Sequence, residues 1–112
     1  MLKITHILKL LSDPNRLRIL RLLDKRKLCV CELAYVLKVT QPSISRHLKK
    51  MKSAGLVGQE QSGFWTDYYL KIENPEDRQV LNLVFHLLKN DSLLKEDLAR
   101  FSKADRRKLC CR

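Results

Sequence analysis

Several features that define other classes of protein are missing from this 112-residue sequence. No apolar run approaches the roughly 20 residues that a membrane-spanning helix needs. With only three glycines and three prolines, the chain is neither collagen-like nor a low-complexity linker. Its start, Met1–His6, lacks the apolar segment and the small-residue cleavage site of a signal peptide. We therefore expect a soluble, cytoplasmic protein.

Acidic residues are scarce relative to basic ones. The 23 lysines and arginines outnumber the 12 aspartates and glutamates, so the net charge at pH 7 is +11. A small domain this basic usually binds a polyanion, because contacts with phosphates release condensed counterions. A membrane surface is the alternative partner, and the missing apolar run argues against it. The rest of the composition, 45% hydrophobic and 31% charged, predicts one globular domain.

Apolar periodicity and helix-start signals divide the chain into helices and a hairpin. Asp13 before Pro14, Thr40 and Asn74 are typical N-caps, and Gly55 is a typical residue at which a helix stops. In the second helix, Arg16, Arg18 and Arg21 are expected to face mostly outward. Helices are predicted over residues 4–11, 14–25, 31–37, 41–54, 75–88 and 92–101, with a two-stranded hairpin between 57 and 72.

The order of these elements predicts the fold class. A short helix, a turn, a longer helix and a hairpin in succession form a winged helix-turn-helix. We therefore expect a mainly α domain with a small β-hairpin over residues 1–101. A basic, cysteine-containing tail follows over residues 102–112.

The predicted helix 41–54 has the two faces that a DNA recognition helix needs. Ile44, Leu48 and Met51 form an apolar stripe, and the opposite face is basic and rich in hydroxyl groups. Arg46 is the candidate for a bidentate guanine contact, whereas lysines there more typically hold phosphates. The predicted DNA-binding residues are Gln41, Ser43, Ser45, Arg46, Lys49 and Lys50 from this helix, with Gln61 and Ser62 from the hairpin tip, or wing.

Two other classes of function fit this pattern less well. Ser43 and His47 are four residues apart, but no orienting carboxylate or oxyanion-hole motif accompanies them. A thiol oxidoreductase needs Cys-x-x-Cys near a βαβ unit, and the sequence has neither. A module that only dimerised would leave the basic helix face unexplained. We therefore expect a DNA-binding protein that is not an enzyme.

The four cysteines form two tight pairs, Cys29 with Cys31 and Cys110 with Cys111. Disulfides are rare in a reducing cytosol, and such close spacing disfavours a relaxed bridge within a pair, so the pairs indicate metal binding or redox sensing. Residues two apart on a regular helix point about 200° apart. Cys29 and Cys31 can therefore share an ion only at a helix start, which also favours the thiolate, or in a distorted turn. Three thiolates suit arsenite, antimonite or lead, and four suit cadmium or zinc.

Three segments carry a family resemblance: Leu11–Leu20, Leu28–Leu33 and Gln41–Leu48, which read LSDPNRLRIL, LCVCEL and QPSISRHL. In this order they resemble the ArsR/SmtB family of metal-sensing repressors, most of all the arsenite-responsive type. The resemblance implies a homodimer that blocks its own operon's promoter until an inducer binds. It also implies a dimer interface built from the first helix and the helix over 75–88, and the broad apolar surface of the latter agrees independently.

One position departs from the resemblance. Arsenite sensors of the best-known type carry a third cysteine three residues after the second, where this chain has Ala34. We predict that Cys110 or Cys111, from the same or the partner subunit, completes a three-sulfur site. A two-coordinate site closed by an exogenous thiol, or a tail pair that binds separately, is the alternative. The zinc-sensing mode of the family needs more ligands than His86, the single histidine in that helix.

The predicted function is a homodimeric repressor that binds operator DNA and dissociates when As(III) or Sb(III) binds. Drawing Cys29 and Cys31 onto one ion should tilt the start of their helix and shift the helix over 41–54. A repressor of the same fold that responds to Cd(II), Pb(II) or oxidation of its thiol pairs is the alternative.

Overall fold

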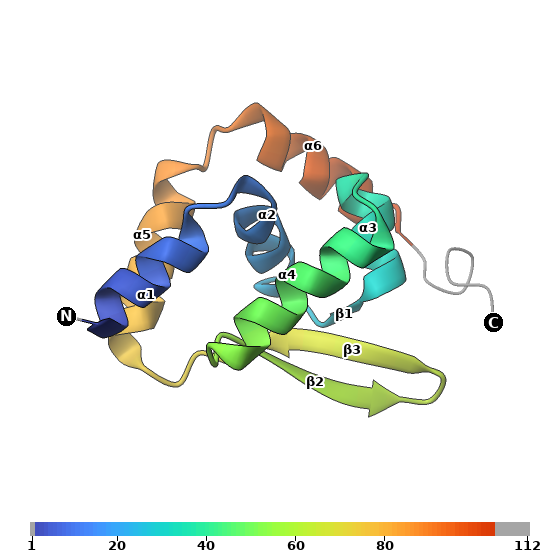
Figure 1. The fold of residues 1–112 in the computed structure, drawn as a ribbon. Coiled ribbons are helices and arrows are strands. Elements are labelled where there is room, and N and C mark those ends of the chain that lie inside the picture. Colours follow the sequence, from blue (N-terminus) through green and yellow to red (C-terminus); the bar gives the residue numbers. More distant parts are fainter. Residues whose placement is uncertain (1, 105–112) are drawn as a thin grey trace.

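The fold is mainly helical, with one small sheet (Figure 1). It is taken from a computed structural model in which residues 2–104 are described, with side chains from residue 3 onward. The predicted winged helix-turn-helix is confirmed. The elements are α1 (Leu2–Leu11), α2 (Pro14–Leu23), β1 (Leu28–Cys29), α3 (Val30–Leu37), α4 (Gln41–Ser53), β2 (Val57–Ser62), β3 (Trp65–Leu70), α5 (Pro75–Leu87) and α6 (Ser92–Phe101).

Short polar side chains begin the helices, as the sequence indicated. The carboxylate of Asp13 accepts a hydrogen bond from the Arg16 backbone N–H at 3.1 Å, at the start of α2. Asn74 and Asp91 act in the same way at the starts of α5 and α6. Each bond satisfies a backbone donor that has no partner inside its helix. Thr40 occupies the N-cap position of α4, but its side chain makes no capping hydrogen bond.

The sheet has one strand more than the sequence predicted. Its order is β1-β3-β2, antiparallel throughout. Strand β1 is two residues long, with Leu28 opposite Tyr68 and Cys29 opposite Asp67. Two residues are too few to show an alternating pattern, so the sequence indicated only the β2–β3 hairpin.

The tip of the wing is a two-residue turn. Ser62 pairs with Trp65, which leaves Gly63 and Phe64 between the strands. Gly63 has a φ of +61°, a conformation that a tight hairpin turn requires and that costs glycine nothing. The Phe64 side chain is 74% exposed at this tip.

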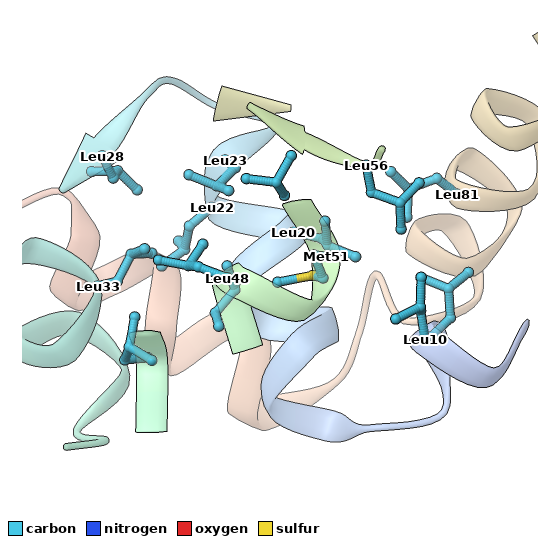
Figure 2. Close-up of a cluster of buried hydrophobic side chains, with 14 of the residues drawn as sticks. Leu10, Leu20, Leu22, Leu23, Leu28, Leu33, Leu48, Met51, Leu56 and Leu81 are labelled. Atoms are coloured by element: carbon cyan, nitrogen blue, oxygen red, sulfur yellow. The ribbon is translucent and has the colours of Figure 1, made fainter. Parts of the chain in front are cut away.

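The core is centred on α2. Leu20, Leu22 and Leu23 of this helix are buried, and Leu48 and Met51 of α4 pack in the same cluster. Figure 2 shows the cluster extending from Leu28 and Leu33 at one end to Leu10, Leu56 and Leu81 at the other. Truncating a leucine buried in this way to alanine costs about 2–5 kcal/mol. The apolar stripe predicted for the recognition helix is therefore the surface that holds it on the domain.

One expectation for α2 is wrong: Arg18 faces inward and is only 8% exposed. Its guanidinium makes two hydrogen bonds of 2.9 Å to the carboxylate of Asp97, which lies in α6 and is 1% exposed. The hydrogen bonds that Arg18 donates to Asp97 raise the pKa of Arg18, although burial acts in the opposite direction. A partner 79 residues away therefore reverses the orientation expected from the helical pattern.

Helices α1 and α5 pack at the opposite end of the molecule from the wing (Figure 1). Ile7 and Leu10 of α1 share the core cluster with Leu81 and Phe85 of α5. Among residues 2–104, no helix is both long enough and apolar enough to cross a membrane.

Candidate thiol site and nucleic-acid interface

Helix α4 presents the basic face that the sequence predicted. Ile44, Leu48 and Met51 are at most 1% exposed, so the opposite face must lie toward solvent. On that face five of the six predicted DNA-binding side chains are exposed and Ser43 is half-buried. The exposed ones are Gln41, Ser45, Arg46, Lys49 and Lys50. Three cations and two hydrogen-bonding groups on one helix face can contact phosphates and base edges.

A histidine connects α4 to the helix that supports it. His47 Nε2 lies 4.0 Å from the Asp13 carboxylate at the start of α2. Burial lowers the pKa of His47, the charges of Arg16, Arg46 and Lys50 lower it further, and Asp13 opposes them. Burial acts to raise the pKa of Asp13, but the Arg16 N–H and the charge of His47 outweigh it, so that pKa is lowered. His47 is therefore a packed and mostly neutral residue at neutral pH.

The wing uses one of its predicted DNA-binding side chains to hold its own shape. Gln61 donates from Nε2 to the Gly63 carbonyl at 3.0 Å. Its Oε1 accepts a hydrogen bond from the Thr66 hydroxyl at 2.9 Å. Ser62 is half-buried beside this turn. Phe64, which was not among the predicted binding residues, is the most exposed large apolar side chain of the wing.

Cys29 lies where the sheet ends and α3 begins. It is the last residue of β1 and the N-cap of α3, with an extended backbone at φ −91° and ψ 169°. Cys29 is only 3% exposed. The expectation that this cysteine precedes regular helix is confirmed, although α3 begins one residue earlier than predicted.

Glu32 completes the start of α3. It is 1% exposed, its Oε1 accepts the Cys29 N–H at 3.2 Å, and the two residues form a capping box. The other carboxylate oxygen pairs with Arg26 at 3.0 Å. Neither residue was predicted from the sequence as part of the site. The spacing Cys29-x-x-Glu32 is that of a capping box with cysteine in place of serine, and this signal could have identified Glu32.

Cys31 lies in the first turn of α3 and faces the recognition helix. It is half-buried, and its Sγ accepts a hydrogen bond from Gln41 Nε2 at 3.7 Å. Gln41 is the first residue of α4. The structure therefore places a predicted metal ligand in contact with a predicted DNA-binding residue.

The described residues do not by themselves form a metal centre. Within residues 2–104, no group of three histidine, cysteine or acidic side chains is placed to hold an ion. The predicted additional ligands, Cys110 and Cys111, lie outside the described residues. The described part of the site is thus the pair Cys29 and Cys31.

Helices α2 and α6 together hold the C-terminal end of α3. Arg18 Nη2 donates to the Leu37 carbonyl at 2.7 Å, and Arg100 Nε donates to the Val36 carbonyl. Both guanidinium groups also contact Asp97. Carbonyls in the last turn of a helix lack partners within it, and cations there also interact favourably with the helix dipole. This network fixes the residues that immediately precede the turn into α4.

An apolar surface on α1 and α5 remains uncovered in the single chain. Leu83 and Leu87 of α5 are 58% and 71% exposed, and Ile4 and Leu8 of α1 are 43% and 52% exposed. A groove lined largely by residues 3–12 and bounded by Ala54, Leu56 and Asp77 lies at this end. The surface coincides with the predicted dimer interface.

Comparison with known proteins identifies the family. The profile described as bacterial regulatory protein, arsR family, matches residues 13–58. An uncharacterized HTH-type transcriptional regulator of Methanocaldococcus jannaschii is 40% identical over 86 residues, covering 76% of this chain and 94% of that protein. The arsenic resistance transcriptional regulator ArsR2 of Pseudomonas putida is 34% identical over 111 residues, covering 94% of this chain and 95% of that protein.

Solved structures agree with these relatives. The transcriptional regulator HlyU from Vibrio vulnificus superposes with a TM-score of 0.67 at 32% identity, covering 76% of this chain and 86% of that one. The segment that matches the arsR-family profile contains Cys29 and Cys31, the turn between α3 and α4, and helix α4. The chain therefore belongs to the ArsR family of winged helix-turn-helix transcriptional repressors.

Proposed function

We propose that this protein is a homodimeric repressor that releases its operator when As(III) or Sb(III) binds the thiols of Cys29 and Cys31. A third sulfur, from Cys110 or Cys111, completes the site. The arsenic resistance regulator of Pseudomonas putida, which aligns along nearly the whole chain, supports a metalloid as the inducer. The preference of these ions for three thiolate ligands supports it independently.

The backbone at the start of α3 supports chelation by the two cysteines. Cys29 is extended and Cys31 is helical, so the 200° separation of a regular helix does not apply to them. An ion can therefore draw the two sulfurs together by a rotation at the helix start, without breaking a turn in the middle of α3. Such a rotation changes the position of the first helix of the helix-turn-helix.

The observation that carries the proposal is the contact between Cys31 and Gln41. A sulfur bound to an ion has turned toward that ion and no longer offers the same lone pair to the amide. Inducer binding therefore changes the surroundings of the first residue of α4. A coupling free energy of about 1–3 kcal/mol between the two sites lowers operator affinity about 5–150-fold.

The position of α6 supports a third sulfur from the same chain. The helix ends at Phe101, against the segment that leads into the thiol pair, and Ala104 still packs on the core. Cys110 follows Ala104 by six residues, a length that spans up to about 20 Å when extended. Cys111 has one further residue of reach.

The DNA-binding role of the exposed face of α4 follows from its chemistry. Arg46 is proposed to read a guanine, Gln41, Ser43 and Ser45 to contact bases or nearby backbone, and Lys49 and Lys50 to hold phosphates. Gln61 and Ser62 are proposed to place the wing along the phosphates. In a dimer joined through α1 and α5, two copies of α4 would enter major grooves about 34 Å apart.

The decisive experiment is a titration of promoter DNA followed by fluorescence anisotropy, over a range of salt concentrations and with arsenite, cadmium or zinc added. We expect arsenite to weaken binding by the wild type and to have no effect on the Cys29→Ser/Cys31→Ser variant. The Cys110→Ser/Cys111→Ser variant tests the tail, and it should need a higher arsenite concentration for the same release of DNA. If cadmium alone released the DNA, the inducer would be a divalent ion and not a metalloid. Unchanged release from the Cys29→Ser/Cys31→Ser variant would refute the site.

A further inference from the structure

Arg26 connects the start of α3 to the end of α6. Its Nη2 donates to Glu32 Oε2 at 3.0 Å, and its Nη1 donates to the Lys27 carbonyl at 3.0 Å. Its Cζ lies 5.0 Å from the centre of the Phe101 ring, on the last residue of α6. The guanidinium is thus held on one edge by the chain, on another by a carboxylate and on its face by an aromatic ring.

Glu32 transmits this anchorage to Cys29. The carboxylate that contacts Arg26 through Oε2 accepts the Cys29 N–H through Oε1. Its side chain is 2% exposed, so protein groups rather than bulk water set its orientation. The bond helps to keep Cys29 in the extended N-cap conformation. The backbone conformation of a cysteine sets the direction of its Cα–Cβ bond and restricts the rotamers that its Sγ can adopt.

We propose that Arg26 is a positioning residue for the sulfur of Cys29. By bridging Phe101 and Glu32 it holds the carboxylate that fixes the Cys29 backbone, without touching the ion. The proposal rests on the proposed function, in which Cys29 is a ligand. Residues that orient a metal ligand in this way usually change metal affinity about 10–100-fold when they are replaced.

The chain contains a matched control for Arg26. Arg21 lies over the ring of Phe85, with 5.2 Å between Cζ and the ring centre, and pairs with the carboxylate of Asp24 at 3.5 Å. It therefore combines a guanidinium, a ring and a carboxylate in the same way. Its partners are Asp24, the C-cap residue of α2, and Phe85 in α5, so it does not anchor Glu32.

The test measures hydrogen exchange of the Cys29 amide in the metal-free protein and, separately, the affinity for arsenite from thiolate–arsenic absorbance. We expect Arg26→Ala to lower protection of the Cys29 amide relative to α4 amides and to weaken arsenite binding about tenfold. Arg26→Lys should recover part of both effects, since it keeps the charge but not the planar fork. Phe101→Leu should give a smaller loss, and Arg21→Ala should change neither quantity.

Each arm can overturn the proposal on its own. Unchanged protection of the Cys29 amide in Arg26→Ala would show that Arg26 does not hold this backbone, whatever arsenite does. Reduced protection with wild-type arsenite affinity would show that the anchorage has no effect on the ligand. If Arg21→Ala lowered amide protection and arsenite affinity as much as Arg26→Ala does, the effect would be general destabilisation. A wild-type protein that binds no arsenite would instead refute the proposed function, and the exchange measurement would still decide whether Arg26 positions Cys29.

Discussion

The side-chain amide of Gln41 donates a hydrogen bond to the sulfur of Cys31 across 3.7 Å. One residue belongs to the first turn of α3 and the other begins the recognition helix. The contact therefore joins the proposed sensing site and the proposed DNA-reading helix within ten residues of sequence.

Replacing Gln41 should weaken the communication between these parts. A neutral hydrogen bond contributes about 0.5–1.5 kcal/mol, so Gln41→Ala should reduce the ratio of operator affinities without and with arsenite about two- to tenfold. Anisotropy titrations in the two conditions measure that ratio. Ser45→Ala, on the same exposed face, should change affinity in both conditions equally. An unchanged ratio in Gln41→Ala would place the coupling elsewhere.

The wing should respond to the inducer as well. Cys29 pairs with Asp67 in the β1–β3 ladder, so moving Cys29 toward an ion disturbs the strand that carries Trp65. Trp65 is the single tryptophan of the chain, and its emission reports on this strand. We expect saturating arsenite to change the emission of the wild type but not of Cys29→Ser/Cys31→Ser. A spectrum unaffected by arsenite in the wild type would show that the wing does not move.

Asp97 should be critical for stability. It is 1% exposed and accepts hydrogen bonds from Arg18 and Arg100. Asp97→Ala leaves the buried Arg18 without its counter-charge, and breaking a buried pair in this way costs about 3–5 kcal/mol. Urea denaturation measures the loss. Lys95→Ala, exposed on the same helix, should lie within about 0.5 kcal/mol of the wild type. A similarly small effect of Asp97→Ala would contradict the role assigned to the network.

Stability should decrease as the pH falls below neutrality, because of His47. Its pKa in the fold lies below the ordinary value of 6.5, chiefly through burial. The unfolded chain therefore binds more protons in this range, so the free energy of unfolding rises with pH. The contribution is complete above about pH 6.5 and is lost as the pH falls through the lower folded pKa. Denaturation midpoints measured between about pH 7 and about pH 5 test this prediction.

A histidine variant makes the pH test specific. His47→Gln should flatten the dependence of stability on pH. The lowered pKa of Asp13 contributes at lower pH, where its stabilising effect is lost on protonation below about pH 4. If His47→Gln kept the wild-type slope between neutrality and about pH 5, another group would be responsible.

The exposed leucines of α5 should be required for dimerisation. Leu83→Glu and Leu87→Glu place charges in the apolar surface formed with α1, and we expect both variants to be monomers in sedimentation experiments. Loss of the linked second half-site should reduce operator affinity about a hundredfold or more. Tyr35→Glu, at a position of α3 that is 47% exposed, is the control and should remain dimeric. A dimer that survives both leucine changes would require a different interface.

Most helices could be predicted from the sequence because their signals are local. Asp13, Asn74 and Gly55 act on backbone groups a few residues away, so their effects are readable without knowledge of the fold. The stripe of Ile44, Leu48 and Met51 is likewise set by helical geometry, and burial confirms it. The DNA-binding residues proposed for α4 follow from that stripe, since they occupy the remaining face.

The site depends more on contacts that are distant in sequence. Strand β1 forms only because β3 is there to pair with it, and that pairing places Cys29 at the junction of sheet and helix. Arg18 faces inward because Asp97, in another helix, neutralises it. The contact of Arg26 with Phe101 has the same origin. Periodicity cannot anticipate such pairs, because it describes only one element at a time.

The sequence alone determined the helix-turn-helix, the basic face of α4 and the pair Cys29 and Cys31 before it, because each depends on residues that are close together in the chain. Only the tertiary structure decided which side chains anchor that pair. The capping carboxylate, the guanidinium that holds it and the helix that supports both come from separate elements. Burying the Glu32 carboxylate costs free energy, and that cost is offset only when the fold brings its partners to it.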